Sequence, residues 1–344
     1  MAIPLRSLAA QVDRKCTVYL SHASGEASVK GTRLVIGEGE ETRTVALESI
    51  RRVVLLGRPR ANSEVLYALM RAGIPVDWLD LSGRPRGQLL SLAGDQHFRL
   101  PVHQQDFAQS PKALELARSL LLAKVTNSAH ILRNRTTLPD GWDHGLSLLR
   151  TATNANALRG AEGWLARLYF SCWDTLIGRF TWHGREYHPA PDPVNAMLSL
   201  GYSLLYARLA SSLHANALDA RIGFFHMTRG THFALASDLM EPFRAAVDNT
   251  VLTTIRKRMV KPEQFQIKNG SCCIADKTLF SKLLEIFEEM FAASYTMYSF
   301  EDGDWRAQKR SMNDYIDDMS AYYYAILTKK PVCHAWRFAV CNDF

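Results

Sequence analysis

The chain has 344 residues, enough for two domains with a sizeable buried core, and its 47% content of hydrophobic residues excludes extensive disorder. A net charge of +7 makes a polyanionic partner plausible without establishing one. No apolar run approaches the roughly 18 residues of a membrane span, and the N-terminal residues lack the hydrophobic core of a secretory signal. The six cysteines are scattered and form no CxxC pair, which is typical of reduced thiols. We therefore expect a cytoplasmic protein with no membrane partner.

Short β-branched runs separated by turn residues extend from Thr17 to Leu90. Their spacing predicts strands over 16–20, 43–47, 50–56, 74–79 and 86–91, a hairpin over 27–36 and a short helix over 64–71. The run Val53–Leu56 is apolar at every position, which indicates a strand covered on both faces. Strands at this spacing predict a small β-sandwich or barrel, and we place this domain at residues 1–93.

Residues 94–110 have a different character. They are rich in Gln and His, poor in periodicity and interrupted by Pro101, so we interpret them as a linker. From 111 to 344 the pattern is helical, and apolar residues at helical spacing predict helices over 112–135, 154–176, 277–297 and 309–328. Pro193 is well placed near the N-terminus of one more helix, and the residues 264–267 and 272–274 suggest a short hairpin around Asn269–Gly270. The fold class is therefore predicted as α+β, with a β-sandwich domain followed by a larger all-α domain.

Candidate metal ligands gather between Ala217 and Arg244. His226 follows a glycine turn, and Asp238 and Glu241 stand three residues apart, so both would project from one face of a helix. A histidine with clustered acids is a ligand set that a hard divalent cation accepts. An isolated histidine beside an acid pair is, however, more often a solvated face, so both interpretations stay open on spacing alone.

A second candidate site lies inside the helix predicted over 154–176. Gly160 and Gly163 flank Glu162, and each glycine costs about 1 kcal/mol relative to alanine in a helix interior. This cost suggests that another helix or a nucleic-acid strand approaches the backbone closely, and the sequence does not decide between them. Together with His226 and Glu241, Glu162 would complete an open cation site of the kind that phosphoryl transfer needs.

Six segments, in this order, resemble the Cas-one family of CRISPR adaptation integrases, and the match extends over nearly the whole chain. The segments are VVLLG to GIPVDWL in the β-domain, AKVTN at 123–127, RGAEG around Glu162, DPVNAMLSLGYSLLYARL at 192–209, IGFFH ending in His226, and DLMEPFR at 238–244. No single segment is decisive, but their order and spacing together are specific.

The resemblance implies a β-sandwich domain that forms a homodimer and a helical domain that carries the metal site. The family's three metal ligands fall on Glu162, His226 and Glu241, and Asp238 falls on the supporting acid, so these four residues are the predicted catalytic group. The implied cofactor is Mg(II) or Mn(II). Relatives often carry a proline where Ala220 stands, and the residues from Lys330 onward match nothing in the family.

The resemblance also implies a reaction and its partners. The family joins the 3′-hydroxyl ends of a prespacer DNA to the leader-end repeat of a CRISPR array by transesterification. The implied partners are double-stranded DNA and the small Cas-two protein, with two Cas-one dimers in each integration complex. Arg229 and Arg244 fall where relatives carry basic residues near the substrate phosphate, and an arginine there could bind the phosphate in a bidentate fashion.

Two other functions stay open. The first is a stand-alone, structure-selective nuclease that cleaves branched DNA without an integration role. The second is a DNA-binding assembly protein in which the acids are only structural. A requirement for Cas-two in DNA joining would separate the integrase from the nuclease, and cation-independent DNA binding without turnover would favour the assembly protein.

Overall fold

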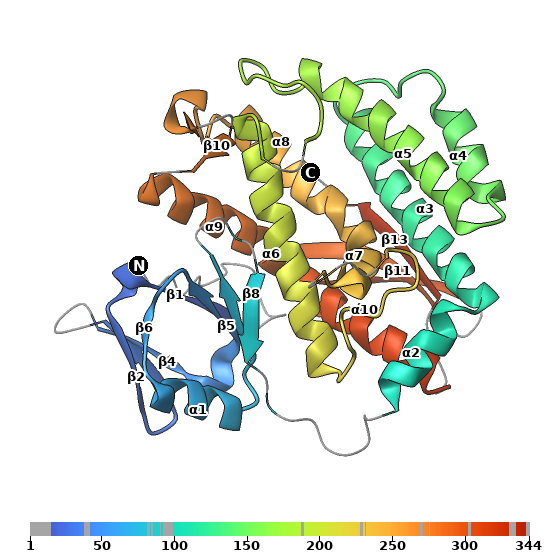
Figure 1. The fold of residues 1–344 in the computed structure, drawn as a ribbon. Helices are drawn as coiled ribbons and strands as arrows, with labels where there is room; N and C mark the ends of the chain where they lie inside the picture. The colour runs from blue at the N-terminus through green and yellow to red at the C-terminus, as the bar shows by residue number, and fades with distance from the viewer. Residues whose placement is uncertain are drawn as a thin grey trace.

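The computed structural model describes residues 15–37, 42–80, 83, 85–89, 91, 99–186, 189–227, 230, 232–268, 271–274, 276–301, 304–329 and 335–341. A strand-rich N-terminal part lies against a larger, mostly helical part (Figure 1). The α+β class predicted from the sequence is confirmed at this level.

The N-terminal part contains two four-stranded sheets. Its elements are β1 (Cys16–Ser21), β2 (Glu26–Lys30), β3 (Arg33–Ile36), β4 (Arg43–Ala46), β5 (Ile50–Leu56), β6 (Arg60–Ala61), α1 (Ser63–Arg71), β7 (Val76–Leu79) and β8 (Pro85–Leu89). One sheet has the order β1-β5-β7-β8 and the other the order β4-β3-β2-β6. In the first sheet β1, β5 and β7 run parallel, and β8 is antiparallel to β7. The sequence predicted these strands but not the parallel order.

Strand β5 is buried on both faces, as its apolar run predicted. Val53 and Leu55 pack into a hydrophobic cluster with the second sheet and α1. Val54 and Leu56 point the other way and pack into the core of the helical part. The first sheet therefore lies between the second sheet and the helices, because side chains alternate across a strand.

The helical part is built around α6 (Pro193–Ala215), which runs through its centre (Figure 1). Its other helices are α2 (Leu100–Ala108), α3 (Pro111–Arg133), α4 (Trp142–Thr151), α5 (Ala155–Ser171), α7 (Ala234–Met240), α8 (Arg244–Arg256), α9 (Lys277–Ala292) and α10 (Met312–Leu327). Helix α6 is buried around most of its circumference, and the Asp192 side chain caps it by accepting the backbone N–H of Asn195 at 2.8 Å. None of the helices described above has the length and apolar character that crossing a membrane requires.

Within the predicted linker 94–110 the structure has a helix, α2 (Leu100–Ala108), where the low periodicity had indicated none. Pro101 stands in the first turn, where a helix does not need the backbone N–H that proline lacks. The buried Gln104 side chain fixes this helix to the rest of the fold: it donates to the Asp219 carbonyl at 2.9 Å and accepts the Asp219 N–H at 3.0 Å. The domain boundaries themselves stay a prediction.

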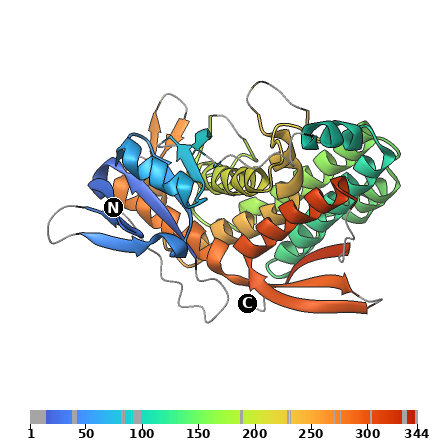
Figure 2. The same cartoon turned by 90° about the horizontal axis from the view of Figure 1, so that it is seen from below.

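The all-α prediction for 111–344 is also wrong. Helix α9 ends at Ala292 and α10 begins at Met312, and the residues between them form the antiparallel hairpin β11 (Ser294–Glu301) and β12 (Asp304–Ser311). Strand β13 (Ala335–Cys341) pairs with β11, and this sheet lies along one side of the helices (Figure 2). The segment SYTMYSFE is rich in aromatic residues and Thr, which favour a strand over a continued helix. A second hairpin, β9 (Gln266–Lys268) with β10 (Ser271–Cys273), forms where the sequence predicted one.

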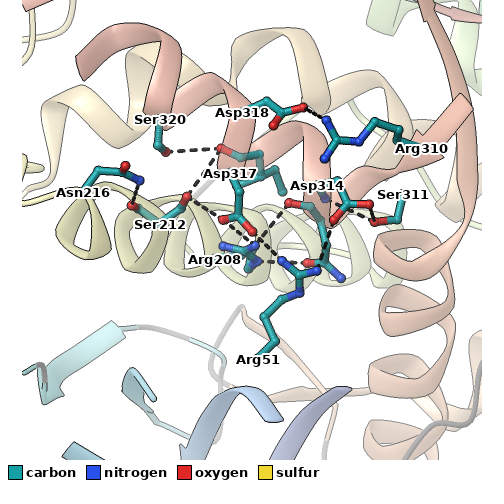
Figure 3. Close-up of polar contacts among 12 residues, drawn as sticks. Arg51, Arg208, Ser212, Asn216, Arg310, Ser311, Asp314, Asp317, Asp318 and Ser320 are labelled. Atoms are coloured by element: carbon teal, nitrogen blue, oxygen red, sulfur yellow. Dashed lines mark hydrogen bonds and ion pairs between the residues drawn. The ribbon is translucent and has the colours of Figure 1, made fainter. Parts of the chain in front are cut away.

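Charged side chains connect the two parts (Figure 3). Arg51 on β5 pairs with Asp314 at 3.2 Å and with Asp317, both on α10. Asp317 also accepts hydrogen bonds from Arg208 and Ser212 of α6, each at 2.7 Å. Arg208 is only 3% exposed, so this cluster joins the first sheet to α6 and α10 through a buried charge.

Candidate metal centre

The sequence predicted one helix that carries both Asp238 and Glu241. In the structure this helix is interrupted at Glu241. Helix α7 ends at Met240, the 3₁₀ turn Glu241–Phe243 follows, and α8 begins at Arg244. The turn is held from α3, because the Asn127 side chain donates to the Pro242 carbonyl at 3.0 Å. Arg244 Nε donates to Glu241 Oε1 at 3.0 Å, so the buried carboxylate is fixed from its own turn as well.

Asp238 organises the loop that carries His226. Its fully buried carboxylate accepts the backbone N–H groups of Phe224, Phe225 and His226 at 2.6, 3.1 and 2.7 Å. It also lies 2.7 Å from His226 Nδ1. A carboxylate accepts a hydrogen bond from Nδ1–H, so in the neutral imidazole Nε2 keeps a lone pair for a ligand. Gly223 is required at the start of this loop, since a Cβ there would lie 2.8 Å from Asp238 Oδ2.

The third acid comes from a different helix. Glu162 on α5 faces Lys124 on α3, whose Nζ lies 2.5 Å from Glu162 Oε1 and 2.7 Å from Glu241 Oε2. His226 Nε2 approaches the other oxygen of Glu241 and lies 3.9 Å from Oε1. Two carboxylates therefore flank a single lysine ammonium, and one imidazole lies next to the second of them.

The electrostatics favour the carboxylate form of Glu241 and the ammonium form of Lys124. Burial alone would raise the pKa of Glu241, but Arg244, Lys124 and His226 together lower it to about 2. Burial opposes the charge on Lys124, yet the Glu241 and Glu162 carboxylates raise the pKa of its ammonium well above the ordinary value. The centre is thus a preformed cation position between two carboxylates.

The side chains at this position fit a hard divalent cation in their chemistry. Two carboxylates and a neutral imidazole are oxygen and nitrogen donors that magnesium or manganese accepts, with further positions left for water or substrate. Glu241 Oε2 is buried and accepts no hydrogen bond of good geometry from the described residues, although Lys124 lies close to it. A buried carboxylate oxygen without such a partner is suited to ligating a metal. No three His, Cys, Asp or Glu side chains within the described ranges are close enough to hold an ion as they stand, and Lys124 lies between two of them.

The structure connects Glu162 to Glu241 through Lys124, and Glu241 in turn to His226. Asp238 and Glu241 both approach the His226 imidazole, Asp238 at Nδ1 and Glu241 at Nε2, and Asp238 positions the ring. Arg244 contacts Glu241, and its predicted contact with a DNA phosphate stays a prediction. Arg229, the other predicted phosphate-binding residue, lies outside the described residues.

Gly160 and Gly163 do not mark a crossing of two helices. A Cβ built on either glycine would meet no atom of the described chain within 4 Å. Of the two alternatives that the sequence left open, the close approach of another helix is not seen at these glycines in the described part of the fold. The surface beside Glu162 is open there.

Sequence reasoning missed Lys124 and Asn127 as parts of this centre. Both lie in SLLLAKVTNSAHIL, where they interrupt a long apolar stretch of α3. A lone lysine and a buried asparagine in such a stretch are unusual, because burying a charge or an amide is costly without a specific partner. That departure from the apolar pattern is the signal that could have found them.

A small cavity of about 40 Å³ lies behind the centre, and Lys124, Glu162, Arg244 and the buried Asp248 are among its lining residues. Burial raises the pKa of Asp248 to about 6, although the hydroxyl of Tyr202 and the guanidinium groups nearby limit the increase. The folded protein therefore holds a proton on Asp248 at a pH where an unfolded chain has lost it.

We expect Asp248→Asn to become relatively more stable as the pH rises. Between pH 4 and pH 7 the wild-type carboxyl must ionise in a buried place, whereas asparagine stays neutral. The difference in unfolding free energy should shift by about 2 to 3 kcal/mol in favour of the variant. Urea unfolding of both proteins at pH 4, 5, 6 and 7 measures this shift, and parallel pH profiles would contradict the raised pKa.

Comparisons with known proteins identify the family. The family model for "CRISPR associated protein Cas1" matches residues 18–289. The chain is 33% identical over 278 residues to "CRISPR-associated endonuclease Cas1 1" of Thermus thermophilus, covering 79% of this chain and 86% of that protein. A casposase bound to integration product has a TM-score of 0.77 at 20% identity, covering 92% of this chain and 91% of the other. A Cas6-RT-Cas1--Cas2 complex has a TM-score of 0.74 at 20% identity, covering 99% of this chain and 38% of that chain.

The fold is thus one that this chain shares with a casposase and with a Cas1-containing complex. The chain belongs to the Cas1 family of CRISPR-associated proteins, since the family model matches most of its length. This confirms the family resemblance drawn from the sequence.

Proposed function

We propose that this protein is a metal-dependent DNA integrase and endonuclease of CRISPR adaptation, which inserts prespacer DNA into the array by 3′-hydroxyl transesterification. The observation that carries this proposal is the chain of contacts from Glu162 through Lys124 to Glu241 and on to His226 Nε2, beside an open surface. The names of the Thermus relative and of the casposase structure support a nuclease or integrase.

In this proposal Glu162, Glu241 and His226 hold the cation, which is Mg(II) or Mn(II). When bound, such an ion neutralises developing charge on a phosphate and lowers the pKa of an attacking hydroxyl. Asp238 keeps the Nε2 lone pair of His226 directed at the centre. Arg244 holds Glu241 in place through Nε, and the proposed contact of its guanidinium with a DNA phosphate would add charge neutralisation.

The open surface beside Glu162 is where we place the DNA backbone. Gly160→Ala and Gly163→Ala should each stabilise α5 by up to about 1 kcal/mol, because nothing in the described fold fills the space of their methyl groups. If DNA occupies that space, the double variant should bind duplex DNA at least several-fold more weakly despite its higher stability. Thermal unfolding and fluorescence anisotropy measure the two effects, and unchanged DNA affinity would place the DNA elsewhere.

The proposed partners are double-stranded DNA and Cas2. The Cas6-RT-Cas1--Cas2 complex supports the second, and the net charge of +7 is consistent with the first. The homodimer with a β-sandwich interface, and the arrangement of two dimers in each integration complex, belong to the same proposal.

A DNA-joining assay tests the proposed function. The protein, its Cas2 partner, a short duplex with free 3′-hydroxyls and a supercoiled plasmid carrying a leader and repeat are incubated with Mn(II) or with EDTA. Label transferred to nicked plasmid with Mn(II), and absent with EDTA, is the expected result. Cleavage of branched DNA without joining would favour the stand-alone nuclease, and cation-independent binding without turnover would favour an assembly protein.

A further inference from the structure

Lys124 occupies the position that a cation would take in the centre. Its Nζ lies within 2.7 Å of both Glu162 and Glu241, and its side chain is only 18% exposed. Without a positive charge there, the nearly buried Glu241 carboxylate would face the Glu162 carboxylate across the same small volume. The lysine therefore stabilises the ligand carboxylates in the protein without DNA.

The same contacts oppose metal binding. A divalent ion between Glu162 and Glu241 would share this small volume with the ammonium, and the two cations repel each other.

We propose that Lys124 is the counter-ion of the DNA-free centre: its ammonium takes the cation position, and it is displaced toward the DNA phosphate when the divalent ion binds. The proposal rests on the proposed function, since it assigns the ion and the phosphate to this centre. The displaced ammonium stays on a flexible four-carbon chain at the rim of the site, and an ammonium is a point charge suited to a phosphate oxygen. Metal loading and substrate binding would then be coupled through a single side chain.

The proposal predicts opposite effects of one substitution on two measurements. Lys124→Met should tighten Mn(II) binding by about tenfold, because the fraction of protein with an accessible site is no longer reduced by the lysine. The same variant should join DNA more slowly at saturating Mn(II), because the phosphate loses a cation. A lysine that is merely structural would weaken both properties together.

Isothermal titration of the DNA-free protein with Mn(II) alone measures the first effect. Lys112→Met is the matched control, since Lys112 lies at the exposed beginning of the same helix α3, and its Mn(II) affinity should equal that of the wild type. Lys124→Gln serves if the methionine variant does not fold, because the amide can still donate to a carboxylate but carries no charge.

Glu162→Gln distinguishes a failure of the counter-ion role of Lys124 from a failure of the proposed function. Mn(II) binding that disappears in this variant, with no tightening in either Lys124 variant, would overturn the counter-ion role and leave the proposed function standing. Wild-type protein that shows no Glu162-dependent Mn(II) binding would overturn both. Tightened binding with an undiminished joining rate would overturn the transfer of the ammonium to the phosphate.

Discussion

Glu162→Gln is expected to lower the DNA-joining rate by at least about a thousandfold while changing the unfolding free energy by less than about 1 kcal/mol. The metal would supply several kcal/mol of stabilisation to the charged transition state, and glutamine is a poor ligand for a hard cation. The stability should change little because the Glu162 side chain is 26% exposed and its salt bridge with Lys124 is screened by water. The joining assay and urea unfolding of the same preparation measure both quantities.

Two further variants test whether the loss follows from the centre as a whole. His226→Ala should remove activity to a similar degree, because it removes the only nitrogen donor of the proposed ligand set. Glu241→Gln should remove activity and also destabilise the fold by about 2 to 3 kcal/mol, since it takes the negative charge from a carboxylate buried beside Arg244 and Lys124. Glu263→Gln, at a 68% exposed acid, is the control and should behave as the wild type. Full activity of Glu162→Gln would eliminate this ligand assignment.

Asp317→Ala should destabilise the protein by about 2 to 3 kcal/mol, the second large effect that we expect. The substitution removes the acid that Arg51, Arg208 and Ser212 share between the first sheet and the helical part (Figure 3). Arg208 is left as a buried charge without its main partner, which costs more than an exposed pair contributes. The effect should fall short of that for a fully buried pair, because the Asp317 side chain is 40% exposed.

The next residue provides the control for this measurement. Asp318 pairs with Arg310, whose side chain is 39% exposed and is therefore not left as a buried charge, so Asp318→Ala should cost no more than about 1 kcal/mol. The double variant Arg208→Met/Asp317→Leu should recover most of the stability, because it removes the buried charge together with its partner. Equal losses from Asp317→Ala and Asp318→Ala in urea unfolding would show that the cluster does not fix the two parts.

Local patterns predicted the features that depend on local physics. The apolar run at β5 predicted a strand covered on both faces, because alternating side chains must all be buried. The β9–β10 hairpin, and the helix that Pro193 begins, were found in the same way. The failures were also local: Pro101 suggested a linker although proline is allowed in the first turn of a helix, and α9 was extended into what is strand β11.

The identity of the candidate ligands came from segments that are recognisable in sequence, around Glu162, His226 and Glu241. Their relation to one another did not come from those segments. Glu162 and Lys124 are 38 residues apart on different helices, and only the packing of α3 against α5 and the 241–243 turn places the ammonium between the acids. The contacts of Asp238, the predicted supporting acid, depend on the fold for a similar reason, because the loop from Gly223 to His226 folds back over its carboxylate.

The sequence by itself therefore determined the family, most of the strands and helices, and the candidate side chains for the chemistry, since these depend on neighbouring residues and on motifs. The tertiary structure alone decided that Lys124 lies between the Glu162 and Glu241 carboxylates, that Asp238 positions the imidazole, and that Gly160 and Gly163 face open space. These properties arise from contacts between distant segments, and burial makes their charges and hydrogen bonds strong. The spacing of residues along the chain does not predict these contacts.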